Sequence, residues 1–401
     1  MNPIKKIYCR AFQTCFKIAL PVLPYRKPKR LKNMEELASL LKKKKCPSVM
    51  IVTDAGIRSF HLTEKLEKEL KNKEISYVIY DKTDANPTTA NVEEALQLYH
   101  DNGCKALIGF GGGSSMDCAK AVGARVAKPR QSLKKMKGIL KVHKKLPLLI
   151  AVPTTAGTGS ETTLAAVIVD SETRHKYPIN DFPLIPKYAV LDPKVTLSLP
   201  PFITATTGMD ALTHAVEAFI GNSTTPGTRT DAFMAVELIF QNLDTAVFDG
   251  GNVEARKNML RASYYAGCAF TKSYVGYVHA VAHSLGGKYN IPHGYANAVI
   301  LPYVLEAYGS KIHSKLYKLA YAAGLADDDT PIEVAAERFI EAIREMQQRY
   351  GIGDKIMGIK EEDIEEMAIC ADKEANPLYP VPVLMNAKEL EVFYRMIMEE
   401  E

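Results

Sequence analysis

Short apolar runs alternate with amphipathic stretches over the first 150 residues, and this alternation constrains the fold more than any other feature. The strand-like runs are Val49–Thr53, Tyr77–Tyr80, Ala106–Phe110 and Leu148–Val152. Helix-like stretches lie between them, at His61–Lys73 and Asn91–Asn102. Strands that alternate with helices predict a parallel sheet of the dinucleotide-binding type.

A glycine-rich turn, Gly111–Asp117, follows the third strand-like run directly, with a helix expected from about Met116. Glycine has no Cβ, so backbone N–H groups can approach a phosphate there, and a helix N-terminus favours negative charge. A tight strand-to-helix turn without a ligand is the alternative. The fourth run leads into Pro153–Glu161, a loop of glycines and hydroxyl side chains that suits ribose, amide and phosphate groups.

Two consecutive prolines, Pro200 and Pro201, mark a change in pattern. Helical patterns dominate beyond them, at Asp231–Phe248, Val253–Thr271, Ile332–Tyr350 and Ala387–Glu399. A chain of 401 residues suggests two domains by length alone. We therefore expect an α/β domain over 1–200, with an N-terminal extension over 1–25, and an all-α domain over 201–401.

The second half concentrates side chains that bind metals. Asp210 and His214 are four residues apart in one helix-forming run, and so are His279 and His283 in another, which places each pair on one helix face. His293 follows shortly, in a Pro-His-Gly corner whose Gly294 is expected to allow a tight turn. One carboxylate and several imidazoles suit iron or zinc. The spacing leaves open which of the three later histidines is not a ligand.

These fragments resemble the iron-containing alcohol dehydrogenase family (group III, metal-dependent). The resemblance rests on Gly-Met-Asp-Ala-Leu-Thr-His ending at His214, on His-Ala-Val-Ala-His from His279, and on Pro-His-Gly-Tyr-Ala-Asn-Ala up to Ala298. It covers roughly residues 25 to 397 and implies a dehydroquinate synthase-like architecture: a parallel α/β coenzyme domain, a helical metal-binding domain and a cleft between them. It implies that the metal ligands are Asp210, His214, His279 and His293, and that His283 is the catalytic histidine near substrate and nicotinamide.

The resemblance also implies a coenzyme site. The family's pyrophosphate loop resembles Gly-Gly-Gly-Ser-X-X-Asp-X-X-Lys, a pattern that Lys120 completes here. The implied coenzyme-binding residues are Asp54, Asn86, Gly112, Gly113, Ser114, Ser115, Asp117, Thr154, Thr155, Thr158, Thr163 and Lys176. Asp54 stands where the family discriminates between coenzymes. Because a carboxylate accepts hydrogen bonds from a ribose 2′-hydroxyl and repels a 2′-phosphate, we expect NAD(H) rather than NADP(H).

The implied function is reversible, metal-dependent hydride transfer between an alcohol, or its aldehyde or ketone, and NAD(H), with Fe²⁺ or else Zn²⁺ as the metal. Two alternatives stay open on the same scaffold: a glycerol- or polyol-type dehydrogenase, and a lyase, against which Asp210 and His214 argue. A further alternative, from another class, is an inactive binding protein that retains the fold.

Several positions depart from the family pattern, and they leave the substrate open. Lys272 replaces a usual asparagine, and Tyr274 and Tyr277 add bulk where small or aliphatic residues are usual, so these tyrosines are expected to narrow the substrate pocket. Leu378 replaces a usual arginine after Asn376-Pro377. Lys272 either pairs with an anionic or polyhydroxy substrate or points to solvent.

Composition narrows the partners and the compartment. The net charge of +5 is too small to predict nucleic-acid binding, and no stretch is long and apolar enough to span a membrane. Seven scattered cysteines without a Cys-X-X-Cys pair indicate reduced thiols and a cytoplasmic protein. Near the N-terminus, Ile4, Tyr8, Phe12 and Phe16 recur every four residues, which predicts a helix packed on the body or on a partner subunit. A membrane-surface role is the weaker alternative. The family suggests a homodimer or larger homo-oligomer.

Overall fold

The computed structural model describes residues 1–399, which form two compact units. One unit is Pro24–Leu199, and the other combines Met1–Leu23 with the chain from Pro200 onward. The second boundary coincides with the Pro200–Pro201 pair, whereas the first places the N-terminal extension with the helical half and not with the α/β half. The two units are described separately below.

A six-stranded parallel sheet forms the centre of the α/β unit, which confirms the predicted fold class. Its strands, in spatial order, are β1 (Lys29–Leu31), β9 (Tyr188–Val190), β6 (Leu148–Pro153), β4 (Ala106–Gly111), β2 (Ser48–Val52) and β3 (Ser76–Tyr80). All six residues of β4 are buried, as expected for a central strand covered on both faces. The ladder pairs Ile51 with Ile108, so the two strands present their side chains in register.

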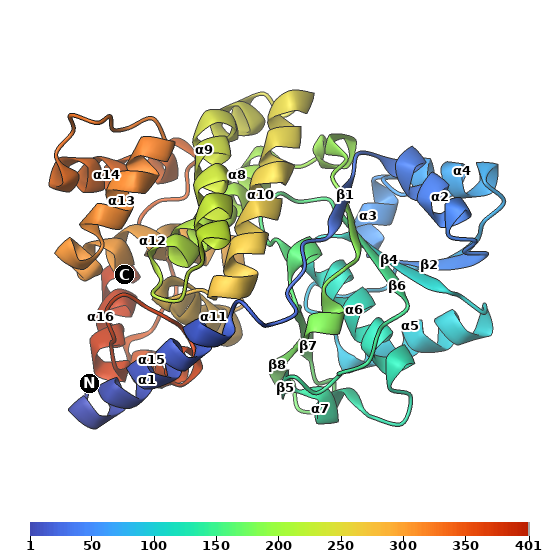
Figure 1. The fold of residues 1–401 in the computed structure, drawn as a ribbon, viewed down its shortest axis with the longest axis horizontal. Coiled ribbons are helices and arrows are strands. Elements are labelled where there is room, and N and C mark those ends of the chain that lie inside the picture. Colours follow the sequence, from blue (N-terminus) through green and yellow to red (C-terminus); the bar gives the residue numbers. More distant parts are fainter. Residues whose placement is uncertain (400–401) are drawn as a thin grey trace. The chain divides into compact units, whose positions relative to one another are not determined.

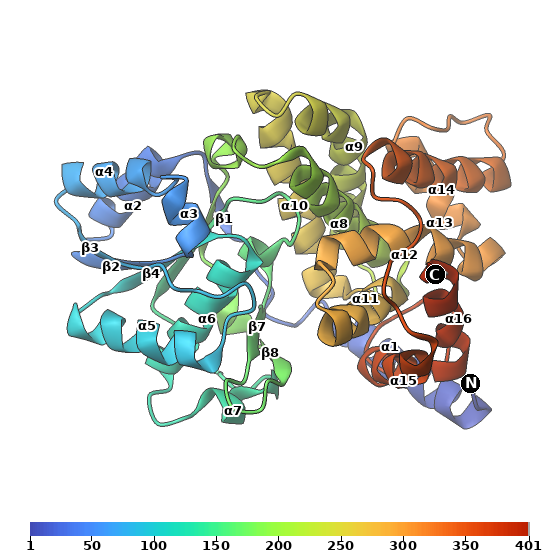
Figure 2. The ribbon, with the colours of Figure 1, turned by 180° about the vertical axis from the view of Figure 1, so that it is seen from behind.

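Helices cover both faces of this sheet (Figures 1 and 2). On one face lie α2 (Met34–Lys43) and α4 (Glu64–Asn72); on the other lie α5 (Thr89–Asp101) and α6 (Gly113–Ala127). The unit also contains α3 (Ala55–Ser59), α7 (Leu133–Met136), a three-stranded sheet of β5 (Gly138–Ile139), β8 (Lys176–Asn180) and β7 (Ala165–Val169), and 3₁₀ turns at Ser160–Thr162, Phe182–Leu184 and Pro193–Thr196.

Strand positions agree with the predicted runs within one residue, but helix starts differ more. The helix expected from His61 begins at Glu64, because His61 adopts a left-handed φ of 58° between the short α3 and α4. The helix expected from about Met116 begins at Gly113. Apolar periodicity marks the middle of a helix well, but local turns decide where it begins.

The helical unit contains ten α-helices among its described residues. Besides α1 (Pro3–Ala19), they are α8 (Pro201–Ile220), α9 (Pro226–Phe248), α10 (Val253–Ser273), α11 (Tyr277–Tyr289), α12 (His293–Tyr308), α13 (His313–Ala322), α14 (Ile332–Arg349), α15 (Glu361–Ala375) and α16 (Ala387–Ile397); a 3₁₀ turn covers Gly309–Lys311. Within residues 1–399, no helix has the length and apolar content needed to cross a membrane. Almost all of α8 from Thr204 onward is buried, so this helix forms the centre of the unit.

Helix α1 packs on the helical unit mainly through a face other than its apolar stripe, and the packing of that stripe on a partner subunit stays a prediction. Ile4 and Tyr8 are exposed, at 77% and 58%, whereas Cys9 and Gln13 are buried. Hydrogen bonds decide which face docks. The segment after α15 presents backbone carbonyls, and Gln13 Nε2 donates to the Tyr379 carbonyl at 2.7 Å. Arg10 donates to two further carbonyls of this segment, at 2.7 and 2.8 Å. Buried carbonyls need donors, so the face that supplies donors is the one that docks.

Candidate metal centre and coenzyme loops

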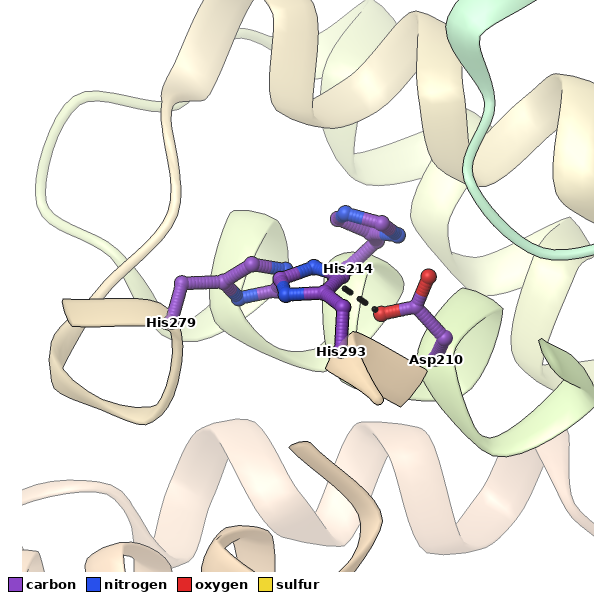
Figure 3. Close-up of side chains that lie close together, drawn as sticks. All are labelled: Asp210, His214, His279 and His293. Carbon is purple, nitrogen blue, oxygen red and sulfur yellow. Dashed lines mark ion pairs between the residues drawn. The ribbon is translucent and has the colours of Figure 1, made fainter. Parts of the chain in front are cut away.

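Three helices bring four metal-ligating side chains together (Figure 3). Asp210 and His214 lie one turn apart on α8, His279 lies in the first turn of α11, and His293 is the first residue of α12. One potential ligand atom from each side chain lies within 4.8 Å of the others. The four residues implied as ligands by the family resemblance therefore form one cluster.

Glu217 orients His279 from the next turn of α8. Its Oε2 accepts a hydrogen bond from His279 Nδ1 at 2.6 Å, and its two oxygens also accept from the Gly276 and Val278 amides at 2.9 and 2.8 Å. A Cβ on Gly276 would approach Glu217 Oε1 to 2.7 Å, so only glycine fits there. The carboxylate fixes the imidazole tautomer and aims Nε2 at the cluster.

The donor set fits a divalent metal ion. His279 Nε2 is buried and has no hydrogen-bond partner among the described residues, which is costly for a polar atom without a ligand. Burial holds the pKa of His279 well below its usual range, and the neighbouring histidines lower it further, so the imidazole is neutral. Burial also raises the pKa of Glu217 to about 7, against its amide hydrogen bonds, and a cation beyond His279 would favour the ionised carboxylate.

The remaining ligands are also positioned by neighbours. Asn297 Nδ2 lies 2.8 Å from Asp210 Oδ1 and 3.0 Å from His293 Nε2. Asp210 Oδ1 lies 3.5 Å from His293 Nε2. Gly294 belongs to α12 and makes no tight turn; a Cβ there would come within 2.7 Å of the Thr206 carbonyl, so this glycine allows α12 to approach α8 closely. That approach brings His293 to Asp210.

His283 lies beside the four-residue cluster. Its ring stacks on that of His293, with centroids 5.1 Å apart, and its side chain is 43% exposed. Its Nδ1 lies 2.6 Å from Glu374 Oε1, and Tyr379 donates its hydroxyl to the same oxygen at 2.6 Å. Although burial alone would raise the pKa of Glu374, His283 and Tyr379 hold it below its usual range. A carboxylate thus orients His283 much as Glu217 orients His279.

The sequence reading missed Glu217, Glu374 and Asn297 as parts of the site. A signal existed for Glu217, because Asp210, His214 and Glu217 follow at i, i+4 and i+7 on one helix face. Glu374 comes from a helix distant in sequence, and only tertiary packing brings it to His283.

The departures from the family pattern have different structural roles. Tyr277 does not narrow a pocket: it is fully buried, and its hydroxyl donates to Asn376 Oδ1 at 3.1 Å and to the Met385 carbonyl at 3.0 Å. Tyr274 packs edge-on against Phe16 of α1, with centroids 5.1 Å apart, and lies 6.2 Å from the Tyr379 ring. It therefore joins α1 to the segment that holds Glu374. Lys272 lies in the last turn of α10 and is partly buried.

In the α/β unit, Asp54 follows β2 and caps α3. Its Oδ1 accepts from the Ile57 amide at 3.0 Å, and its Oδ2 accepts from the Ser115 hydroxyl at 2.9 Å. Ser115 is itself fully buried, so its hydroxyl positions Asp54. Gly111 has φ of 151°, and a Cβ there would meet Ser115 Oγ at 2.5 Å, so the turn requires glycine.

The other predicted coenzyme residues gather around the same strand ends. Gly113 begins α6, and a Cβ on it would meet the Thr158 side chain at 3.4 Å; one on Gly112 would lie 4.0 Å from Thr155 Oγ1. Thr154 follows β6, and its amide donates to the Gly111 carbonyl at 3.0 Å. Ser114 donates its hydroxyl to the Ala85 carbonyl, next to Asn86. Lys176 Nζ donates to Asn86 Oδ1 at 2.8 Å.

Lys120 ties the two loops together. It is fully buried, and its Nζ donates to Ser160 Oγ at 2.8 Å, to Thr163 Oγ1 at 2.7 Å and to the Ala165 carbonyl at 2.7 Å. Asp117 lies 3.4 Å away and accepts from Ser160 Oγ at 2.7 Å and from the Val167 amide at 3.0 Å. Asp117 and Thr163 are therefore engaged in holding the second loop against α6.

Family profiles match both halves of the chain. The profile described as iron-containing alcohol dehydrogenase matches residues 30–193, and that of the C-terminal part of the same family matches residues 204–398. The NAD-dependent methanol dehydrogenase of Bacillus methanolicus is 37% identical over 84% of this chain and 88% of its own length. The 1,3-propanediol dehydrogenase of Citrobacter freundii is 37% identical over 95% and 98%.

Solved structures agree with these sequence matches. A crystal structure of 1,3-propanediol oxidoreductase has a TM-score of 0.89 and 34% identity, covering 93% of this chain and 98% of that one. The alcohol dehydrogenase from Oenococcus oeni has a TM-score of 0.88 and 32% identity, covering 93% and 100%. With both halves matched by profile, sequence and structure, the chain belongs to the iron-containing alcohol dehydrogenase family.

Proposed function

We propose that Asp210, His214, His279 and His293 hold one divalent iron ion, and that this centre serves NAD(H)-linked oxidation of an alcohol and the reverse reduction. The observation that carries the proposal is the convergence of four ligand atoms within 4.8 Å around the buried Nε2 of His279. When bound there, the metal supplies Lewis-acid polarisation of the substrate oxygen. The family is a group of oxidoreductases that act on alcohols, which agrees with this role.

The ligands fit this chemistry by their charge. One carboxylate and three imidazoles contribute a single negative charge, so a divalent ion in this set stays net positive. Glu217 keeps His279 in the tautomer with a lone pair on Nε2, and Asn297 restrains Asp210 and His293. These restraints reduce the reorganisation needed when the substrate binds.

We assign the proton transfer to His283. In the oxidative direction the alcohol C–H bond breaks, its electron pair passes to NAD⁺, a C=O bond forms and the hydroxyl proton leaves. The hydrogen bond from Nδ1 to Glu374 orients the ring of His283, and we propose that this imidazole receives the proton and passes it to solvent. Its 43% exposure gives the proton a path out. Glu374 acts here as a positioning residue.

For the coenzyme, we propose that NAD(H) binds at the strand ends that carry the glycine-rich and hydroxyl-rich loops. Gly112, Gly113 and Ser114 at the start of α6 suit the pyrophosphate, because backbone amides there are exposed to an anion. Thr154, Thr155 and Thr158 contribute hydroxyl and amide groups, and Lys176 contributes a charge. Asp54 suits the adenosine ribose. The methanol dehydrogenase relative is named as NAD-dependent, which supports the same coenzyme here.

The relatives suggest the substrate class. Methanol and 1,3-propanediol dehydrogenases are both similar to this chain over most of their length, so we propose a short aliphatic alcohol or diol. The seven free cysteines support a cytoplasmic enzyme, because a reducing compartment keeps thiols unpaired. We also propose a homodimer or larger homo-oligomer, as the family suggests.

The decisive experiment is anaerobic. The purified protein is loaded with Fe²⁺ or Zn²⁺, and NADH is followed with methanol, ethanol, 1,3-propanediol and glycerol, and with the corresponding aldehydes for the reverse reaction. Iron-dependent turnover is expected. The His283→Ala variant should bind iron as tightly as the wild type and lose about 10²–10⁴-fold in kcat. His279→Ala should lose the iron itself. Iron loss from the His283 variant, or retained iron in the His279 variant, would overturn the assignment.

A further inference from the structure

The α/β unit contains a cavity of about 380 Å³ that lies away from the coenzyme loops. Leu149, at the start of β6, and Lys187, just before β9, line it. All strands of the six-stranded sheet are parallel, so their N-terminal ends lie on one side of the sheet and their C-terminal ends on the opposite side. The Gly111–Asp117 and Pro153–Glu161 loops follow C-terminal ends. The cavity thus lies at the N-terminal ends of the strands, and the coenzyme loops lie at their C-terminal ends.

The floor of the cavity is apolar, and one of its walls is the segment before β1, which includes Pro24 and Arg26. Leu146, Leu149 and Ile185 are buried, at 7%, 3% and 0% exposed. Tyr25 packs edge-on against Phe182, with ring centroids 4.9 Å apart, and Arg26 donates a hydrogen bond to the Ile185 carbonyl. These contacts hold the segment in place, so the cavity is a built feature of the fold. Its volume falls in the lower part of the range for small-ligand sites, roughly 300–1,000 Å³.

The rim carries positive charge. Arg26, His143, Lys145 and Lys187 all line the cavity. Burial lowers the pKa of Lys187, and the positive charges of Lys145, Arg26 and Lys44 lower it further. Among the described residues, no carboxylate lies within 4.0 Å of the Lys145 or Lys187 ammonium. Lys145 and Lys187 are exposed, so water solvates both ammonium groups, and an anion bound between the rim cations would relieve their mutual repulsion.

The acid in the lining does not supply that anion. Asp181 is 2% exposed, and its Oδ2 accepts from the Val142 and His143 amides at 2.8 and 2.9 Å. His143 Nδ1 lies 3.9 Å from the same oxygen. Asp181 therefore fixes the loop that carries His143, and among the described residues no ion pair joins Asp181 to Lys145 or Lys187.

We propose that this cavity, here called the basic pocket, binds a small organic anion: its carboxylate or phosphate group between Arg26, Lys145 and Lys187, and its apolar group against Leu146 and Leu149. The pocket is separate from the loops proposed to hold NAD(H), so binding here does not depend on the function proposed above. Organic carboxylates and organic phosphates both combine an anionic head group with an apolar group. The experiment below distinguishes the two head groups.

The test is calorimetric titration of the full-length protein at saturating NAD⁺, which occupies the other phosphate-binding loops. The probes are phenyl phosphate, benzoate, inorganic phosphate and the neutral benzamide. Phenyl phosphate or benzoate should bind, inorganic phosphate should bind at least tenfold more weakly than phenyl phosphate, and benzamide should not bind. The tighter of the two aromatic anions identifies the head group. Benzamide binding as tightly as benzoate would overturn the proposal, as would no binding of either anion at millimolar concentration.

Matched variants place the binding in the basic pocket. Lys145→Gln and Lys187→Gln should each raise the dissociation constant about tenfold, whereas Lys68→Gln, which removes an exposed charge of α4 in the same unit, should leave it unchanged. An independent readout uses amine acetylation followed by mass spectrometry. The bound anion should protect Lys145 and Lys187 but not Lys68. Unchanged affinity in both pocket variants would show that the anion binds elsewhere and would contradict the proposal.

Discussion

Two carboxylates on different helices orient two neighbouring histidines, and their roles are expected to differ. Glu217 holds His279, which faces the metal cluster, and Glu374 holds His283, which lies outside it. Carboxylates behind ligating histidines raise ligand basicity and fix ring orientation. We therefore expect changes at Glu217 to affect metal affinity and changes at Glu374 to affect proton transfer.

Glu217→Gln tests the metal half of this distinction. The amide keeps the shape but loses the negative charge behind His279, so iron affinity should fall by roughly 10–100-fold. Competition with a chelator measures it. Glu374→Gln is the matched control and should keep wild-type iron affinity while losing turnover. Equal iron affinity in wild type and Glu217→Gln would contradict the positioning role.

Asp54 gives a prediction about coenzyme choice. Asp54→Asn removes the charge that would repel a 2′-phosphate but retains an oxygen to cap α3. The ratio of kcat/KM for NADP⁺ to that for NAD⁺ should rise at least tenfold. Ser115→Ala, which removes one hydrogen bond to Asp54 but keeps its charge, should change that ratio much less. An unaltered ratio in the Asp54 variant would place coenzyme discrimination elsewhere.

Glu161 makes stability depend on pH. Burial raises its pKa from 4.5 to about 7, although a backbone amide and Lys120 lower it. The folded state thus holds this proton more tightly than the unfolded state, so stability falls as pH rises between about 4.5 and 7 and stays reduced above. Glu161→Gln should therefore raise the melting temperature relative to wild type more at pH 8 than at pH 4.5. A difference independent of pH would show that Glu161 titrates normally.

At the scale of elements, strands could be predicted more accurately than helix ends and helix faces. Val49–Val52 and Ala106–Phe110 are buried on both faces, so their apolar runs mark them directly. The expected metal ligands rest on a family motif, because spacing alone left His279, His283 and His293 undistinguished. The α1 helix was predicted, but apolar periodicity could not reveal its polar docking contacts, because the carbonyls come from a segment about 370 residues away.

The inner face of α1 is expected to support turnover. Gln13 and Arg10 hold the segment that contains Tyr379, and Tyr379 bonds to Glu374. Gln13→Leu keeps the volume but removes the donor to the Tyr379 carbonyl, so kcat should fall several-fold with iron content unchanged. The control is Ile18→Ser on the exposed face of α1, which should leave kcat at the wild-type value. Equal kcat in both variants would show that the segment holds its position without α1.

At the scale of the molecule, the two compact units separate the proposed ligands. The proposed iron ligands all belong to the helical unit, and the proposed NAD(H) residues all belong to Pro24–Leu199. A ligand at 100 times its dissociation constant stabilises the state that binds it by about 2.7 kcal/mol. Fe²⁺ should therefore slow amide hydrogen exchange mainly in α8, α11 and α12, and NAD⁺ mainly around β2, β4 and α6. Uniform protection by either ligand would indicate that the chain opens as one cooperative body.

The groups that hold α1 lie about 370 residues further along the chain, so the ribosome makes α1 well before it makes these partners. Lys5 pairs with Asp372 across 367 residues, and Met1 reaches Glu389. At about 5–20 residues per second, the nascent helix waits roughly 20–70 s for these partners. Most helical stability in proteins comes from tertiary packing, so α1 lacks that stabilisation during this time and its apolar side chains stay exposed. Translation speed thus sets how long the inner face of α1 stays uncovered before the helix can dock.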